Sequence, residues 1–179
     1  RLAPGPDELE QRGTSMKLSR SDQVEPLVRL GIEKPARAFA SIRRLAASPD
    51  WKVREVAATV LVRVGKRHPQ AVLAEMKKWS RSTDENIRRA SSEGLRGIAR
   101  IEPESVLPVL ENLRHDPSAY VRKSVANILR DATRKSPDVV MKTCLGWLRG
   151  ATESTRWILK NGIRKLPEEQ QRSILSKME

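Results

Sequence analysis

Arginine recurs along this sequence at a fixed interval. Arg96, Arg130 and Arg164 are each separated by 34 residues. Guanidinium groups bind phosphate oxygens, and a cation that repeats at constant spacing can follow the evenly spaced phosphates of a nucleic acid. The chemistry that these residues predict is therefore the binding of a polyanion.

The overall charge favours the same kind of partner. The chain of 179 residues has 35 Lys and Arg against 22 Asp and Glu, which gives a formal net charge of +13. Its pI is about 10.6. Such an excess of positive charge is typical of proteins that bind polyanions, so we predict nucleic acid as the leading partner.

Residues for other chemistries are sparse. The two histidines, His68 and His115, form no metal-ligand spacing with each other or with the single cysteine, Cys144. The sequence has no Gly-rich phosphate loop and no nucleophile motif. We therefore predict neither a metal nor a cofactor, and we expect Cys144 to be a core residue.

The interval of 34 residues also holds for prolines. Four of them keep it without a gap: Pro35, Pro69, Pro103 and Pro137. A period in this range, held over several copies, indicates a solenoid whose units bury their apolar faces against neighbouring units. Proline is tolerated in the first turn of a helix, so each proline predicts the start of a helix.

Each unit contains two helical patterns. In the copy 69–102, apolar residues have helical spacing over the first part: Val72, Leu73, Met76 and Trp79. A polar break at 80–85 follows, and a second helical pattern begins near Asn86. Each repeat is therefore expected to be a pair of antiparallel helices.

The turn between the two helices identifies the repeat type. An acidic turn is followed by an aliphatic residue and an arginine, as in Asp50-Trp51-Lys52-Val53-Arg54. This pattern resembles HEAT repeats and differs from that of tetratricopeptide repeats, which share the same length. We therefore predict an all-α fold, a right-handed α-solenoid of HEAT-like two-helix repeats.

The period also divides the chain. We predict a single domain at 16–179, made of a leading helix at 22–32, repeats at 35–68, 69–102, 103–136 and 137–170, and a C-terminal cap at 171–179. Residues 1–15 contain Pro and Gly without periodicity. They are expected to be either the remnant of an expression tag ahead of Met16 or a disordered native arm.

The second helix of each repeat is amphipathic. In the third copy one arc of the helical wheel is apolar, with Val121, Val125, Ile128, Leu129 and Ala132. Repeated on four helices packed about 8–10 Å apart, the opposite polar arc forms a stripe roughly 35 Å long, enough for about ten base pairs. The residues predicted to bind DNA are Arg89, Arg96, Arg100, Lys123, Asn127, Arg130, Arg134, Asn161 and Arg164.

A second arginine column has a different expected role. Its members lie inside the apolar arc: Arg54, Arg88, Arg122 and Arg156. A guanidinium group there needs a partner, and the turn residues Asp50, Asp84 and Asp116 are the candidates. We predict a ladder of ion pairs and hydrogen bonds between repeats that supports folding.

Two stretches carry a more specific likeness. They are 79–96, with Ser92-Glu93-Gly94, and 107–131, with Tyr120-Val121-Arg122-Lys123-Ser124-Val125-Ala126-Asn127. They resemble the bacterial alkylpurine DNA glycosylases built from HEAT-like repeats, the AlkC and AlkD group, and AlkC more closely. The resemblance extends from about Asp50 to Leu166. It implies binding of duplex DNA on a concave helical face and removal of N3- or N7-alkylated purines.

The implied reaction needs a carboxylate on the DNA face. An alkylated, cationic purine is a good leaving group, so the enzyme chiefly stabilises an oxocarbenium-like sugar and positions water. Glu93 is the first catalytic candidate and Glu55 the second. Aromatic candidates for a place beside the lesion are Trp157, Trp51 and Tyr120.

The sequence also departs from the family pattern. Arg54 stands where AlkD has its catalytic Asp, Asn127 stands where a Trp is expected, and the loop after Gly94 is shorter than in AlkC. We therefore predict DNA binding and leave excision open. The alternative is a non-catalytic scaffold for an acidic protein.

No apolar run reaches the roughly 20 residues of a membrane helix, so we expect a cytoplasmic protein. As a protein that binds DNA it is expected to be associated with the nucleoid. We also expect it to be a monomer.

Overall fold

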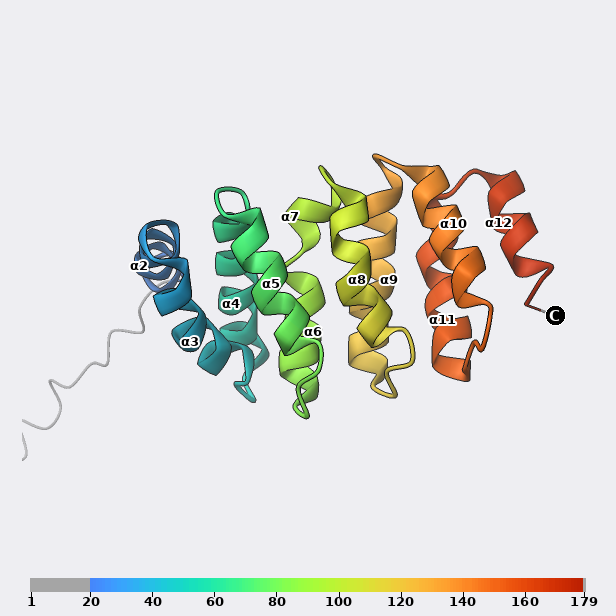
Figure 1. The fold of residues 1–179 in the computed structure, drawn as a ribbon. Coiled ribbons are helices and arrows are strands. Elements are labelled where there is room, and N and C mark those ends of the chain that lie inside the picture. The colour runs from blue at the N-terminus through green and yellow to red at the C-terminus, as the bar shows by residue number, and fades with distance from the viewer. Residues whose placement is uncertain (1–19, 179) are drawn as a thin grey trace, which may run out of the picture.

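The computed structural model describes residues 20–178, and within them the chain is helical without a strand (Figure 1). Its helices are α2 (Arg20–Glu33), α3 (Pro35–Ala46), α4 (Trp51–Gly65), α5 (Pro69–Trp79), α6 (Glu85–Glu93), α7 (Arg96–Ala99), α8 (Pro103–Leu113), α9 (Ala119–Thr133), α10 (Pro137–Trp147), α11 (Glu153–Gly162), the 3₁₀ turn η1 (Ile163–Lys165) and α12 (Glu168–Leu175). The predicted all-α solenoid of two-helix repeats is confirmed.

The repeated prolines begin the first helix of every repeat. Pro35, Pro69, Pro103 and Pro137 are the first residues of α3, α5, α8 and α10, as predicted. Three of the second helices, α4, α6 and α11, begin at positions capped by a side chain instead. The side chain of Asp50 accepts a hydrogen bond of 2.8 Å from the Lys52 backbone N–H, and Asp84 does the same for Asn86. These caps satisfy backbone donors that have no partner within the helix.

Equivalent apolar positions of successive repeats form the core. The column Met76, Leu110 and Cys144 is completely buried, which confirms Cys144 as a core residue. Burial raises the pKa of its thiol to about 12. The predicted apolar arc of α9 is likewise buried along its whole length. Stacking therefore buries the apolar side of each helix pair against the next pair.

Two of the second helices are broken, a feature that was not predicted from the sequence. The helix α6 ends at Gly94 before the short helix α7, and α11 ends at Gly162 before η1. A Cβ atom on Gly94 would lie 2.9 Å from Leu61 Cδ1, and one on Gly162 would lie 2.7 Å from Leu129 Cδ1. Only glycine permits these close approaches to the preceding repeat. The equivalent residues in α4 and α9 are Val60 and Ile128, and those helices are continuous.

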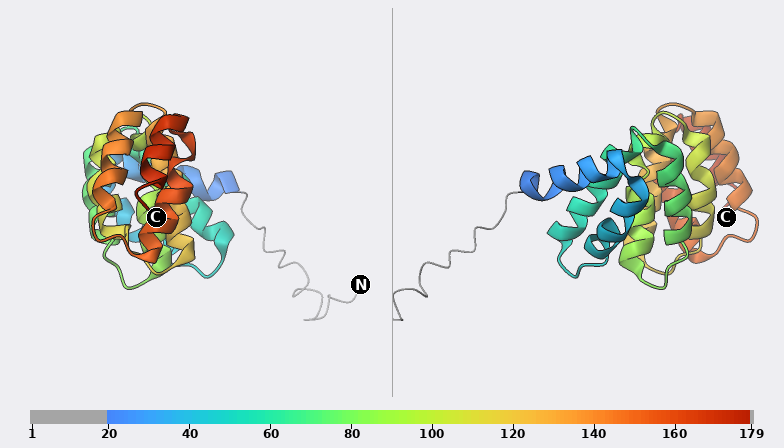
Figure 2. Two further views of the ribbon diagram at one scale, coloured as in Figure 1. Left: turned by 90° about the vertical axis from the view of Figure 1, so that its right-hand side faces the viewer. Right: turned by 60° about the vertical axis from the view of Figure 1, so that its left-hand side comes forward.

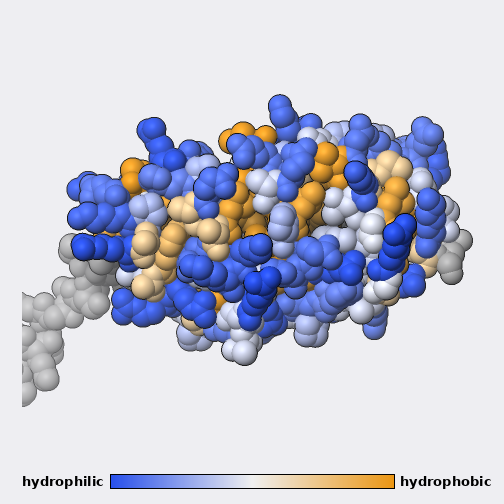
Figure 3. Space-filling model, in the orientation of Figure 1, coloured by the Kyte–Doolittle hydropathy of each residue, from blue (hydrophilic) through white to orange (hydrophobic). Residues whose placement is uncertain are grey.

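The helices form two rows. First helices α3, α5, α8 and α10 form one row, and second helices α4, α6, α9 and α11 form the other (Figure 1). Viewed from the C-terminal end, the repeats lie one behind another (Figure 2). We call the solvent side of α4, α6, α7, α9 and α11 the second-helix face. The first-helix row is mainly hydrophilic with apolar surface between helices (Figure 3), and a pocket of about 780 Å³ lies between α8 and α10.

The two ends of the solenoid differ slightly from the predicted boundaries. The helix α2 covers the predicted leading helix and is longer at both ends. The final helix begins at Glu168, ahead of the predicted boundary between 170 and 171. The segment 1–15 lies outside the described residues, and the division into a tag and a domain stays a prediction.

Candidate nucleic-acid interface and carboxylate pocket

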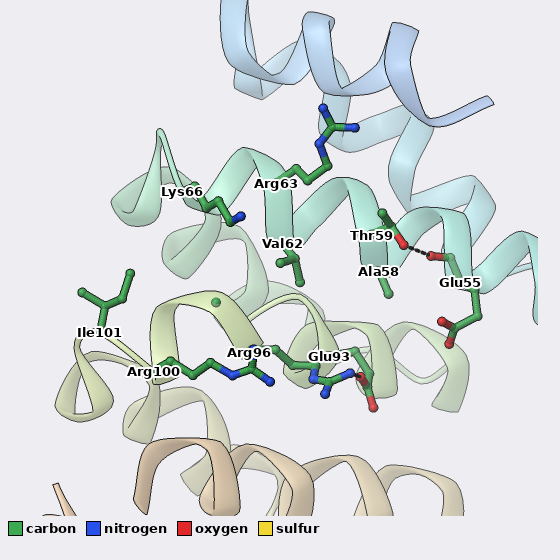
Figure 4. Close-up of a pocket in the computed structure, with 11 residues that line it drawn as sticks. Glu55, Ala58, Thr59, Val62, Arg63, Lys66, Glu93, Arg96, Arg100 and Ile101 are labelled. Atoms are coloured by element: carbon green, nitrogen blue, oxygen red, sulfur yellow. Dashed lines mark hydrogen bonds and ion pairs between the residues drawn. The ribbon is translucent and has the colours of Figure 1, made fainter. Parts of the chain in front are cut away.

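A pocket of about 550 Å³ lies on the second-helix face between α4 and the broken helix α6–α7 (Figure 4). Its walls combine acidic, basic and aliphatic side chains: Glu55, Ala58, Thr59, Val62, Arg63, Lys66, Glu93, Arg96, Gly97, Arg100 and Ile101. Because the chain turns at Gly94, α7 and the residue directly after it place Arg96 and Arg100 at the pocket wall. The break in the second helix therefore helps to shape the pocket.

Both predicted catalytic carboxylates contact one arginine. The Nη2 atom of Arg89 lies 3.6 Å from Glu55 Oε1 and 3.7 Å from Glu93 Oε1. Arg96 approaches the other oxygen of Glu93 at 3.9 Å. The structure thus brings Glu55 from α4 and Glu93 from α6 together around Arg89, and Glu93 does pair with neighbouring arginines.

Glu93 is the more deeply buried of the two, with only 6% of its surface exposed. Burial raises the pKa of its carboxyl above the ordinary value, Arg89 and Arg96 act in the opposite direction, and Glu55 and Asp131 add to the rise. A carboxylate with a raised pKa at a protein surface pocket is suited to accepting a proton.

Asp131 is a third carboxylate of this cluster, and the sequence analysis did not propose it. It is buried on α9, and its Oδ1 accepts hydrogen bonds from Arg100 Nε at 3.0 Å and Nη2 at 2.9 Å. Its Oδ2 lies 3.3 Å from Arg96 Nε. The available signal was that Asp131 is the sole acidic residue of the cationic helix α9.

Six of the nine predicted DNA-binding residues fall into two groups. Arg89, Arg96 and Arg100 contact the three carboxylates; we call these six residues, Glu55, Arg89, Glu93, Arg96, Arg100 and Asp131, the paired cluster. Lys123, Arg134 and Arg164 on α9 and after α11 are exposed and form no ion pair within residues 20–178; we call them the open cations. The predicted stripe is therefore not uniform.

Arg130 lies beside the open cations and is more constrained. Its side chain donates to the Asn127 side-chain oxygen and, at 2.7 Å, to the Asn161 carbonyl oxygen. Burial and the nearby Arg164 lower the pKa of its guanidinium, while Asp131 opposes the shift. Arg130 and Arg164 thus place two like charges close together, an arrangement that favours an anion between or beside them.

None of the three aromatic candidates is among the residues that line the pocket. Trp51, at the start of α4, is 60% exposed. Trp157 faces the Arg122 guanidinium at 5.7 Å from the ring centroid. Tyr120 lies under the guanidinium of Arg89 at 4.3 Å.

The arginine column inside the apolar arc is satisfied differently from the prediction. Arg88 pairs with Asp116 of the next repeat at 2.6 Å, as expected. Asp50 and Asp84 instead cap helices, and Arg54 donates to the carbonyl oxygens of Ser48 and Pro49. The expected ladder of aspartate partners was wrong at those two positions, where the carboxylate accepts a hydrogen bond from the backbone N–H of its own helix.

The described residues contain no group of three or more His, Cys, Asp and Glu side chains that could hold a metal ion. No helix in the described part of the chain has the length and apolar character required to cross a membrane.

Three solved structures share this solenoid. Alkylpurine DNA glycosylase AlkC of Pseudomonas fluorescens, bound to DNA containing an abasic site analog, is 25% identical with a TM-score of 0.72 over 87% of this chain and 45% of that chain. The present chain thus spans less than half of that AlkC chain. The smu.31 protein of Streptococcus mutans UA159 is 26% identical over 79% of this chain and 72% of that one, with a TM-score of 0.66.

AlkD2 of Streptococcus mutans shows the same fold over 92% of both chains, with 23% identity and a TM-score of 0.68. No match is found among curated proteins. The family model for HEAT repeats matches residues 40–130. The resemblance to HEAT-like alkylpurine DNA glycosylases predicted from the sequence is confirmed, and the chain belongs to the HEAT-repeat family.

Proposed function

We propose that this chain is a DNA alkylation repair protein that binds duplex DNA across its second-helix face and excises cationic N3- or N7-alkylated purines at the paired cluster. The observation that carries the proposal is that Glu55 and Glu93 line one pocket, with Asp131 held against its wall by Arg96 and Arg100, on the same face as the open cations. The structural likeness to AlkC, which was solved with DNA, supports it.

The two groups of residues would have separate tasks. The open cations would bind phosphates of the DNA backbone, which contributes affinity without sequence selectivity and makes binding strongly dependent on salt. Arg96 and Arg100, whose side chains are 46% and 44% exposed, would contact phosphates next to the lesion while they hold Asp131. DNA would then cross the face with the damaged nucleotide over the pocket.

Glu93 is the residue that we propose for the chemical step, with Glu55 as its partner. Because an alkylated purine already has a positive charge, breaking its bond to C1′ leaves a neutral base and an oxocarbenium-like sugar. A carboxylate next to C1′ stabilises that charge and accepts a proton from the water that attacks C1′. The burial that raises the pKa of Glu93 suits it to the second role.

A scaffold that binds an acidic protein remains the alternative. The open cations alone would suit either polyanion, because both offer regularly placed negative charges. The carboxylate cluster favours the first proposal, because cleavage of an N-glycosidic bond uses a carboxylate next to C1′, whereas three acidic groups would repel either polyanion and have no use in a scaffold. Salt-dependent binding of duplex DNA of arbitrary sequence supports the first proposal.

The decisive experiment measures release of 3-methyladenine and 7-methylguanine from methylated duplex DNA under single-turnover conditions. We expect release by the wild-type protein and a rate roughly 100- to 1,000-fold lower for Glu93→Gln, the size of effect found when one electrostatic group is removed from an active site. Glu104→Gln, at an exposed position on α8, is the matched control and should retain the rate. Equally little release by wild type and Glu93→Gln would show that the chain is a binder, and equal release at a high rate would show that Glu93 is not the catalytic residue.

A further inference from the structure

Tyr120 occupies a position that is aromatic in one repeat and polar in the others. The equivalent residues are Lys52, Asn86 and Ser154. Tyr120 is half-buried near the start of α9, with the Arg89 guanidinium 4.3 Å and the Arg54 guanidinium 5.4 Å from its ring centroid. A ring covered by two guanidinium groups has little surface left for a base to stack on.

One side of this arrangement is anchored in the turn before α4. Arg54 Nη1 donates hydrogen bonds of 2.7 Å to the Ser48 carbonyl oxygen and 2.8 Å to that of Pro49. Arg54 Nη2 donates to the Tyr120 hydroxyl at 3.2 Å, across 66 residues of sequence. The ring is therefore fixed by the first repeat, although it belongs to the third.

The other side reaches the carboxylates. Arg89 packs on the ring, and its Nη2 lies within 4 Å of both Glu55 and Glu93. Its side chain is only 16% exposed. An arginine side chain has several rotatable bonds and loses rotamer entropy when it is held in one geometry. A rigid ring beneath the guanidinium favours that geometry, and the cation–π contact adds to it.

We propose that Tyr120 is a positioning residue of the carboxylate pocket, which holds Arg89 between Glu55 and Glu93 and makes no contact with the substrate. This inference rests on the proposed function for its catalytic meaning. The geometric part concerns the DNA-free protein alone and can be tested there.

A displacement of Arg89 would change the balance of charge around Glu93. The groups that face Glu93 are Arg89 on α6, Arg96 on α7, Glu55 on α4 and Asp131 on α9. Three further cations line the same pocket: Arg63, Lys66 and Arg100. Since Arg89 lowers the pKa of Glu93 and the two other acids raise it, a loosely held Arg89 leaves that pKa higher.

The test is a titration of the Glu93 side-chain carboxyl by NMR in the DNA-free protein. Tyr120→Leu removes the ring, and we expect the pKa of Glu93 to rise by about one unit, the lower end of the effect of a nearby opposite charge. Tyr120→Phe keeps the ring beneath Arg89 but loses the hydroxyl that Arg54 bonds, and it should shift that pKa less than Tyr120→Leu does. Trp157→Leu removes the ring of the fourth repeat that the Arg122 guanidinium faces. This variant should leave the pKa of Glu93 unchanged. An unshifted Glu93 pKa in folded Tyr120→Leu overturns the proposal.

A double-mutant cycle separates positioning from a general loss of stability. Arg89→Gln should raise the Glu93 pKa by itself, and adding Tyr120→Leu should raise it no further. A second, additive shift would show that the tyrosine acts without Arg89, and the proposal would be wrong.

Excision provides the second readout. We expect Tyr120→Leu to lower the single-turnover rate about tenfold, to move the acidic limb of the pH–rate profile to higher pH, and to leave the Kd for DNA within about twofold. A weaker Kd with an unchanged rate would place Tyr120 at the DNA and contradict the inference. Absence of excision by the wild type would defeat the proposed function, whereas the NMR titration would still decide the role of Tyr120.

Discussion

Arginines at equivalent positions of the second-helix face have different surroundings in the two halves of the solenoid. Arg96, after the break in α6, contacts Glu93 and Asp131, whereas Arg164, after the end of α11, forms no ion pair within residues 20–178. Their sequence register is the same. The difference arises because carboxylates from α6 and α9 meet at Arg96, whereas none of the described acidic residues pairs with Arg164.

This contrast separates two uses of positive charge. A paired arginine fixes the place and the protonation of a carboxylate, and its own contribution to binding a polyanion is reduced. An exposed, unpaired cation keeps its full charge for a phosphate. A net charge of +13 therefore says little about affinity until the pairing of each cation is known.

The strongest test of this contrast removes the open cations. Replacing Lys123, Arg134 and Arg164 together by Ala should weaken binding to duplex DNA about 100-fold at low salt and reduce the salt slope by about three, because each lost phosphate contact contributes about one unit. Fluorescence anisotropy at several salt concentrations measures both. The matched control is the triple Ala variant of Arg37, Arg44 and Lys77, three exposed cations of the first helices. Equal losses in the two triple variants would mean that net charge alone decides binding.

The break in α6 can be tested by adding one methyl group. Gly94→Ala places its Cβ 2.9 Å from Leu61 Cδ1, and we expect overpacking to lower the free energy of unfolding by about 1–3 kcal/mol. Chemical denaturation followed by circular dichroism measures it. Gly146→Ala on α10 is the control, since no atom lies within 4 Å of its added Cβ, and it should be neutral or stabilising by up to about 1 kcal/mol. A neutral Gly94→Ala would show that α6 and α4 can separate freely.

Asp131→Asn should convert part of the paired cluster into open cations. With the carboxylate removed, Arg96 and Arg100 lose their shared partner, and we expect binding to undamaged duplex DNA to become about tenfold tighter with a salt slope steeper by about two. Isothermal titration at two salt concentrations measures the change. Unchanged affinity would indicate that both arginines already leave Asp131 when DNA binds.

The smallest expected effect concerns stability and pH. Burial raises the pKa of Glu93 in the folded protein above its ordinary value of 4.5. The stability that comes from protonating such a group is fully present below the unfolded pKa and is lost as the pH rises through the folded pKa. Replacing Glu93 by the neutral Gln should therefore raise the midpoint of thermal unfolding at pH 7, and this gain should disappear below about pH 4. Scanning calorimetry of Glu93→Gln and wild type from pH 3.5 to 7 measures this gain. A gain that does not change with pH would contradict the raised pKa of Glu93.

Much of the architecture could be predicted because repetition makes local signals unambiguous. Proline at the start of each first helix and apolar residues such as Met76, Leu110 and Cys144 at equivalent positions specify helix pairs and their stacking. The break at Gly94 was not predicted. Glycine in a helical pattern reveals nothing about the residue of the preceding repeat that must come close to it, which here is Leu61.

The sequence by itself determined the repeat, the buried columns, the cationic register and the candidacy of Glu93 and Glu55, because each depends on residue type and on one period. Only the tertiary structure decided which cations are paired, that Asp131 belongs to the cluster, and that Tyr120 lies beneath Arg89 with its hydroxyl bonded to Arg54. These contacts join residues on different repeats, and their energies depend on distances of a few ångströms and on burial, which the order of residues along the chain does not specify.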